Sequence, residues 1–150
     1  MARDRIVAKV TREIDARPHE VFAAWTDPEH PASPWSKHNG PIRLAIMNRA
    51  VDGLFYINMG PPMPLQTHYG RFTRLERPRL IEHTWASEGT QGVDTLVRIT
   101  LKTRGDRTLF SLRHTGLPNP ESARAHEEGW GMILGWLQNG FASRRRTAKP

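Results

Sequence analysis

PESARAHEEGWGMILGWLQNGF, residues 120–141, constrains the architecture of this chain more than any other segment. Its apolar side chains recur at the 3.6-residue period of an α-helix, which places them on one face. That face carries His126, Trp130, Ile133, Leu134, Leu137 and Phe141. Asn119 can cap the first turn, and Pro120 fits the first helical position because its missing N–H is not needed there. We therefore expect a long amphipathic helix that covers a sheet.

Four glycines interrupt this helix, at positions 129, 131, 135 and 140. Each lowers helix stability by up to about 1 kcal/mol relative to alanine, so tertiary packing must offset the loss. Gly131 and Gly135 are four residues apart and share one flank of the helix. We expect that flank to approach another element so closely that an added methyl group would overpack the contact.

The sequence before this helix predicts one strand, a short helix and then six more strands. The first strand covers residues 4–15, and the short helix starts at Pro18 after Arg17, which is a poor cap. The later strands are expected at 42–51, 54–59, 68–75, 80–87, 94–103 and 108–115. Turn signals such as Asp52-Gly53 join successive strands directly, which favours an antiparallel sheet. The sequence therefore predicts an α+β fold.

Composition limits the possible functions of the chain. It has 150 residues and no cysteine, which excludes a disulfide framework and a thiol nucleophile. No apolar run is long enough to span a bilayer, and the segment MARDRIVAKV lacks the apolar core of a signal peptide. We expect a cytoplasmic protein with no membrane insertion.

The net charge of +7 does not indicate a nucleic-acid-binding protein. Four positive charges lie in the last seven residues, at Arg144, Arg145, Arg146 and Lys149, which leaves +3 on the remainder (7 minus 4). No basic run is interleaved with aromatic residues that could stack on bases. We expect one domain over residues 1–143, a disordered basic tail over 144–150, and no nucleic-acid partner.

Five stretches resemble one known superfamily and occur in its order: 12–35 (REIDARPHEVFAAWTDPEHPASPW), 51–59, 69–85, 108–117 and 129–137. They are similar to the START-like or SRPBCC superfamily (Bet v 1-like), in the branch named after the activator of Hsp90 ATPase homologue. The resemblance implies a helix-grip fold. In it, a curved antiparallel sheet of about seven strands wraps a long C-terminal helix, and one or two short helices follow the first strand. Members include lipid or hormone carriers, polyketide cyclases and aromatases, and co-chaperone domains, and many have a cavity for hydrophobic ligands.

Strand alternation and the helix stripe together predict which side chains line such a cavity. The expected ligand-binding residues are Phe55, Met59, His83, Trp85, Phe110, His114 and Trp130, with His126 as a further candidate. Each histidine alone is more simply explained as a core residue, whereas the cluster favours a pocket. The predicted function is binding of a small hydrophobic or aromatic ligand.

An enzyme that uses the same cavity, similar to a polyketide cyclase, an aromatase or a hydrolase, is the alternative. Its candidate residues are His83, His114 and Glu82, although alternation places Glu82 and His83 on opposite faces of their strand. Enzyme status stays open, and we favour a non-enzyme. No residue in particular marks a chaperone-interacting surface or a homodimer, which are further alternatives.

No motif predicts a metal or a cofactor. The chain has no nucleophile elbow and no phosphate-binding loop. His126 is followed directly by Glu127 and Glu128, which is not the spacing of a helical zinc motif. We expect both glutamates on a solvated helix face.

Overall fold

The computed structural model describes residues 6–64 and 67–148, with side chains as far as Arg144. In chain order the elements are β1 (Ala8–Ile14), α1 (Pro18–Thr26), β2 (Ile42–Met47), β3 (Leu54–Met59), β4 (Thr67–Glu76), β5 (Leu80–Ser87), the short 3-10 helix η2 (Glu88–Thr90), β6 (Thr95–Arg104), β7 (Arg107–Thr115) and α2 (Pro120–Ala148). This order confirms the one that the sequence predicts.

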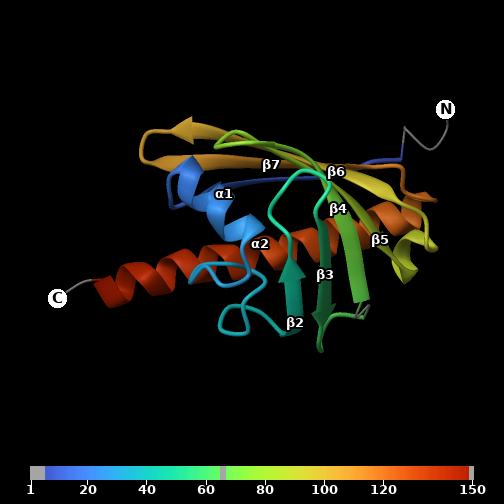
Figure 1. Ribbon diagram of the computed structural model, residues 1–150, viewed down its shortest axis with the longest axis horizontal. Helices are drawn as coiled ribbons and strands as arrows, with labels where there is room; N and C mark the ends of the chain where they lie inside the picture. The colour runs from blue at the N-terminus through green and yellow to red at the C-terminus, as the bar shows by residue number, and fades with distance from the viewer. Residues whose placement is uncertain (1–5, 65–66, 149–150) are drawn as a thin grey trace.

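The seven strands form one curved antiparallel sheet with the order β1-β7-β6-β5-β4-β3-β2. Figure 1 shows α2 running along the length of the molecule beside this sheet. The predicted α+β helix-grip fold is therefore confirmed. Two strands are shorter than expected. Strand β1 ends at Ile14 and begins only at Ala8. Strand β2 ends at Met47, and residues 48–53 form the connection to β3, in which Asp52 has a positive φ of 69°.

Helix α2 begins and packs as its sequence indicates. The Asn119 side chain accepts a 2.8 Å hydrogen bond from the backbone N–H of Ser122, which caps the first turn. The predicted stripe is buried from Trp130 to Phe141, and its residues share one core cluster with those of the sheet. The helix continues to Ala148. Residues 144–148 are therefore helical where the sequence suggested a disordered tail, and residues 149–150 lie outside the described part of the chain.

The expectation of a close approach at Gly131 and Gly135 is wrong. A Cβ atom at Gly135 would meet nothing within 4 Å, and one at Gly131 would lie 3.7 Å from Nη2 of Arg12, which is ordinary contact. The close approach occurs at Gly140 instead, where a Cβ would lie 2.6 Å from the carbonyl oxygen of Ala32. Glycine is required where α2 meets the loop after α1, nearer the C-terminal end of the helix.

Helix α1 and the loop after it close one part of the core. Arg17 precedes α1 and makes no capping hydrogen bond with its side chain, as its residue type suggests. Trp35 in the loop donates a 2.7 Å hydrogen bond from its indole to the carbonyl oxygen of Trp25, and the two rings meet edge to face at 5.0 Å. No helix in the described residues is long and apolar enough to cross a membrane.

Candidate functional site

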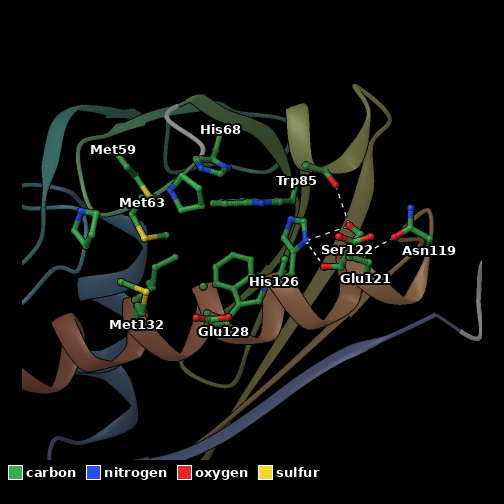
Figure 2. Close-up of a pocket in the computed structure, with 17 residues that line it drawn as sticks. Met59, Met63, His68, Trp85, Asn119, Glu121, Ser122, His126, Glu128 and Met132 are labelled. Atoms are coloured by element: carbon green, nitrogen blue, oxygen red, sulfur yellow. Dashed lines mark hydrogen bonds between the residues drawn. The ribbon is translucent and has the colours of Figure 1, made fainter.

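A cavity of about 410 Å³ lies between α2 and the sheet (Figure 2). Its apolar wall comprises Met59, Met63, Trp85, Trp130, Met132 and Ile133, with small residues and prolines at positions 62, 64, 89, 125 and 129. Its polar lining residues are His68, Asn119, Glu121, Ser122, His126 and Glu128. An apolar wall with a few polar groups is the usual constitution of a small-molecule site.

Helical and strand periodicity explain why these residues meet. On α2, cavity residues occur at 121, 125, 128 and 132 and, beside them, at 122, 126, 129, 130 and 133. Steps of three or four residues place both rows on one broad face of the helix. From the sheet, Trp85 points inward by alternation along β5, and Met59 is the last residue of β3. Met63 comes from the proline-rich loop after β3. In the view of Figure 2, Met59, Met63 and Met132 lie at one end of the cavity, whereas Asn119 and Ser122 lie at the other.

Trp85 lines the cavity and contains a buried hydrogen-bond donor for which the described residues provide no acceptor. Its indole is stacked on the imidazole of His68 with ring centres 4.9 Å apart, and it tilts against the indole of Trp130 at 4.7 Å. The side chain is buried, and its Nε1–H has no acceptor among the residues described. A buried donor without a partner lowers stability by about 1–3 kcal/mol. The nitrogen has almost no accessible surface, so its neighbours enclose this donor and it is not open to the cavity.

His126 contributes a neutral imidazole to the same cavity. Its Nδ1–H donates a 2.8 Å hydrogen bond to the carbonyl oxygen of Ser122, one turn earlier in α2. The other ring nitrogen is therefore an acceptor in the neutral form. Burial lowers the pKa of His126, although the bond to Ser122 opposes this shift. The ring is therefore uncharged at neutral pH.

Three of the seven predicted ligand-binding residues line the cavity: Met59, Trp85 and Trp130. The other four, Phe55, His83, Phe110 and His114, are buried outside it. Phe55 is opposite Gly70 across β3 and β4, and a Cβ there would be 2.5 Å from the Phe55 ring. The ring of Phe55 thus occupies space that a larger residue on β4 would otherwise fill. It belongs to the packed core and does not line this cavity.

His83 is a hydrogen-bonded core residue. Its Nδ1–H donates to the carbonyl oxygen of Thr84 at 2.9 Å, and its Nε2 accepts a bond from the Trp25 indole at 3.4 Å. Complete burial lowers the pKa of His83 to about 4, although the bond to Thr84 opposes the shift. Both ring nitrogens are occupied in the neutral form, so His83 has no free nitrogen for a substrate.

His114 lies behind the cavity wall, where its Nδ1 accepts a 3.0 Å bond from the indole of Trp130. Glu82 is on the other face of the sheet, where its carboxylate accepts a 2.8 Å bond from the hydroxyl of Thr73. Arg98 lies 3.7 Å from the same carboxylate. None of the three candidate catalytic residues therefore lines the cavity. Within the described residues, no three His, Asp or Glu side chains gather as a metal site would require.

Sequence reasoning misses part of the lining. Glu128 is exposed, as expected for a solvated helix face, but it also lines the cavity. The helical spacing of Glu121, Ala125, Glu128 and Met132 is an available signal, because these residues form a second face beside the buried stripe. No comparable signal points to Met63 and His68, since they enter through a loop and a strand end whose path depends on the whole fold.

The model of the family described as Activator of Hsp90 ATPase homolog 1-like protein matches residues 15–141. This chain belongs to that family. The match covers α1, all six strands after it, and α2 as far as Phe141. The predicted resemblance is thereby confirmed, and the cavity of this family member lies within the matched region. No curated protein sequence matches the chain.

Solved structures share the family fold. CalU16 from Micromonospora echinospora is 23% identical, with a TM-score of 0.69 over 94% of this chain and 79% of that one. PFC0360w, an HSP90 activator from Plasmodium falciparum, is 21% identical, with a TM-score of 0.58 over 75% of this chain and 74% of that one. DynU16, a putative protein in the dynemicin biosynthetic locus, is 18% identical, with a TM-score of 0.70 over 91% of this chain and 47% of that one. Similarity at this level shows a common fold.

Proposed function

We propose that this protein binds a small, largely hydrophobic molecule in the cavity between α2 and the sheet. The observation that carries the proposal is a pocket of about 410 Å³ whose wall is largely apolar and whose lining contains a few polar groups. Concave, mostly apolar pockets with a small number of polar groups are the usual sites of small-molecule binding.

The composition of the wall suits an aromatic or aliphatic ligand. Two tryptophans offer flat apolar surfaces, and three methionines offer flexible, polarisable ones that can adapt to the shape of a guest. The volume falls within the range of about 300–1,000 Å³ that is typical of ligand pockets.

The two alternatives have less support. The enzyme alternative loses its candidate residues, because His83, His114 and Glu82 lie outside the cavity. Other titratable side chains do line it, namely His68, His126, Glu121 and Glu128. A chaperone-interacting role is suggested by the family description and by the likeness to PFC0360w, an HSP90 activator. Exposed apolar side chains on the neighbouring strands β2, β3 and β4 (Leu44, Ile46, Leu54 and Tyr69) are typical of a protein-interaction surface, but they carry no feature specific to a chaperone.

The proposal can be tested by blocking the cavity from α2. Gly129 lines it, and a Cβ at this position would be 3.8 Å from the nearest atom, Cε of Met63. The longer side chain of Gly129→Leu should therefore extend into the cavity. Gly135→Leu is the matched control, because that glycine is on the same helix, outside the cavity, with open space around it. Both substitutions raise helix propensity.

The binding of a neutral probe, 1-naphthylmethanol, should be measured by isothermal titration calorimetry. We expect binding to the parent protein and to Gly135→Leu, and at least about a tenfold loss of affinity in Gly129→Leu, because the filled cavity cannot hold the two rings. Native mass spectrometry of the purified protein would also reveal a retained natural ligand. Equal binding by the two leucine variants would show that the probe binds elsewhere, and the proposal would fail.

A further inference from the structure

The lining of the cavity has the opposite charge to the protein as a whole. The chain carries a net charge of +7. Among the described residues that line the cavity, however, there are two carboxylates, Glu121 and Glu128, and no lysine or arginine. Both carboxylates come from the cavity face of α2 (Figure 2). A ligand that enters therefore meets negative charge on an otherwise basic molecule.

These two carboxylates are not neutralised by the residues around them. Both side chains are exposed, and no ion pair involves either of them in the described part of the chain. Arg124 lies between them in the sequence but is exposed and outside the lining. Glu121 and Glu128 are seven residues apart, so about 10 Å of helix separates them. They can act on a cation at different points along the cavity rim.

The interior of the cavity adds a second requirement. Its wall is largely apolar, and the imidazole of His126 is neutral because burial lowers its pKa. Among the residues described, no lysine or arginine lines the cavity, so a ligand carboxylate that leaves water gains no ion pair with such a side chain. A cationic group that stays at the rim, near the exposed carboxylates, keeps its hydration and gains their attraction.

We infer that the cavity selects arylalkyl amines: ligands with a flat apolar body for the wall and a positively charged group near Glu121 or Glu128. Hydrophobic acids of the same shape are disfavoured. The inference rests on the proposed function, since it concerns the chemistry of the ligand that the same cavity binds.

Three probes of nearly the same shape separate charge from hydrophobicity: 1-naphthylmethylamine, which is a cation near neutral pH, 1-naphthylmethanol, which is neutral, and 1-naphthoate, which is an anion. Their affinities should be measured by isothermal titration calorimetry at low ionic strength. An exposed charge pair changes affinity by up to about fivefold, and the two carboxylates attract the cation and repel the anion. We therefore expect the cation to bind about fivefold more tightly than the anion. The neutral probe should be intermediate, and added salt should reduce the differences.

Charge-neutralising variants test whether these carboxylates are responsible. Glu121→Gln and Glu128→Gln should each lower the ratio of the affinity for the cation to the affinity for the anion by about two- to threefold. Glu127→Gln is the matched control, because it removes the same charge from the same helix at a residue outside the cavity lining. Its ratio should equal that of the parent protein.

The outcomes distinguish this inference from the proposed function. If none of the three probes binds, the proposed function fails and the inference fails with it. If the alcohol binds but the carboxylate binds as tightly as the amine, the cavity binds ligands without this selectivity, and only the inference is overturned. If all three glutamine variants lower the ratio equally, the preference reflects overall charge, and the assignment to the cavity rim is wrong.

Discussion

The indole N–H of Trp130 donates a 3.0 Å hydrogen bond to Nδ1 of His114, directly behind the cavity wall. Because Nδ1 is the acceptor, the proton of the neutral ring is on Nε2, which lies 2.6 Å from the hydroxyl oxygen of Thr95. That hydroxyl in turn donates to the carbonyl oxygen of Trp85, also at 2.6 Å. A continuous chain of hydrogen bonds therefore links the two cavity tryptophans through the core. His114 supports the cavity without lining it.

The first prediction concerns this chain. His114→Leu should lower the free energy of unfolding by about 2–4 kcal/mol, because it leaves the Trp130 N–H without an acceptor in the buried core and removes the donor to Thr95. Urea denaturation at neutral pH measures the change.

Trp130→Phe in the same background supplies the control. The phenyl ring has no N–H, so the penalty for an unpaired donor disappears, and the double variant should be less destabilised than the sum of the single variants. Additive effects would show that the Trp130–His114 hydrogen bond contributes no coupling.

Stability should also depend on pH through the buried histidines. Burial lowers the pKa of His83 from 6.5 to about 4, so in this pH range the unfolded chain binds more protons than the folded one. Stability should therefore be constant above about pH 6.5 and decrease as the pH falls toward 4. The contribution of His83 over that window is about 3 kcal/mol, at about 1.4 kcal/mol for each pH unit. Burial also lowers the pKa values of His114 and His126, which adds to the loss in the same direction.

Urea denaturation at several pH values between 4 and 7.5 tests this dependence. In His83→Gln the slope of unfolding free energy against pH should decrease by an amount equivalent to almost one proton at pH 5. The exposed His38 provides a comparison, and His38→Gln should keep the slope of the parent protein. A parent protein whose stability is the same at pH 4.5 and pH 7 would contradict the assignment of His83 as a neutral core residue.

The sequence predicted which faces are buried more reliably than it predicted where the cavity is. Alternation assigned Phe55, His83 and Trp85 to inward faces, and all three are buried. The period of a strand gives the direction of a side chain, but not whether a neighbour fills the space in front of it. The rings of Phe55 and His83 pack edge to face with their centres 5.0 Å apart, so each fills the space in front of the other. The Trp85 ring, by contrast, borders the cavity. Such differences depend on contacts between strands that are distant in sequence.

The glycines of α2 illustrate the same limit. Helical spacing places Gly131 and Gly135 on one flank of the helix, but it cannot show how much room lies beside that flank. An added Cβ would meet only the Arg12 side chain, at 3.7 Å from Gly131, and nothing within 4 Å at Gly135. The loop that approaches α2 comes from residues about a hundred positions earlier, at Ala32, and meets Gly140. The spacing within one helix carries no information about the path of such a loop.

The third prediction uses this contrast. Gly140→Ala should destabilise the protein by about 1–3 kcal/mol, because a Cβ only 2.6 Å from the Ala32 carbonyl oxygen forces backbone to move. Gly135→Ala, with no atom within 4 Å, should stabilise it by up to about 1 kcal/mol through helix propensity. Paired urea denaturation curves measure both. Stabilisation by both substitutions would mean that the loop after α1 does not contact α2 as described.

The last prediction concerns Gly70, on which the ring of Phe55 lies. A Cβ at this position would be 2.2 Å from the carbonyl oxygen of Thr84 and 2.5 Å from Cζ of Phe55. The ring has little room to move, because Phe72 and His83 lie 5.4 and 5.0 Å away on other sides. Gly70→Ala should therefore lower the unfolding free energy by about 3 kcal/mol, at the upper end of the range for overpacked cores.

Phe55→Leu tests the cause of that loss. Leucine lacks the outer ring atoms, so the double variant Gly70→Ala, Phe55→Leu should be more stable than the sum of the two single changes predicts. The gain should be only partial, because the Thr84 carbonyl still meets the new methyl group. Strictly additive losses would show that the ring does not occupy the space above Gly70. In that case the assignment of Phe55 to the packed core would have to be abandoned, and Phe55 would again be a candidate for the cavity wall.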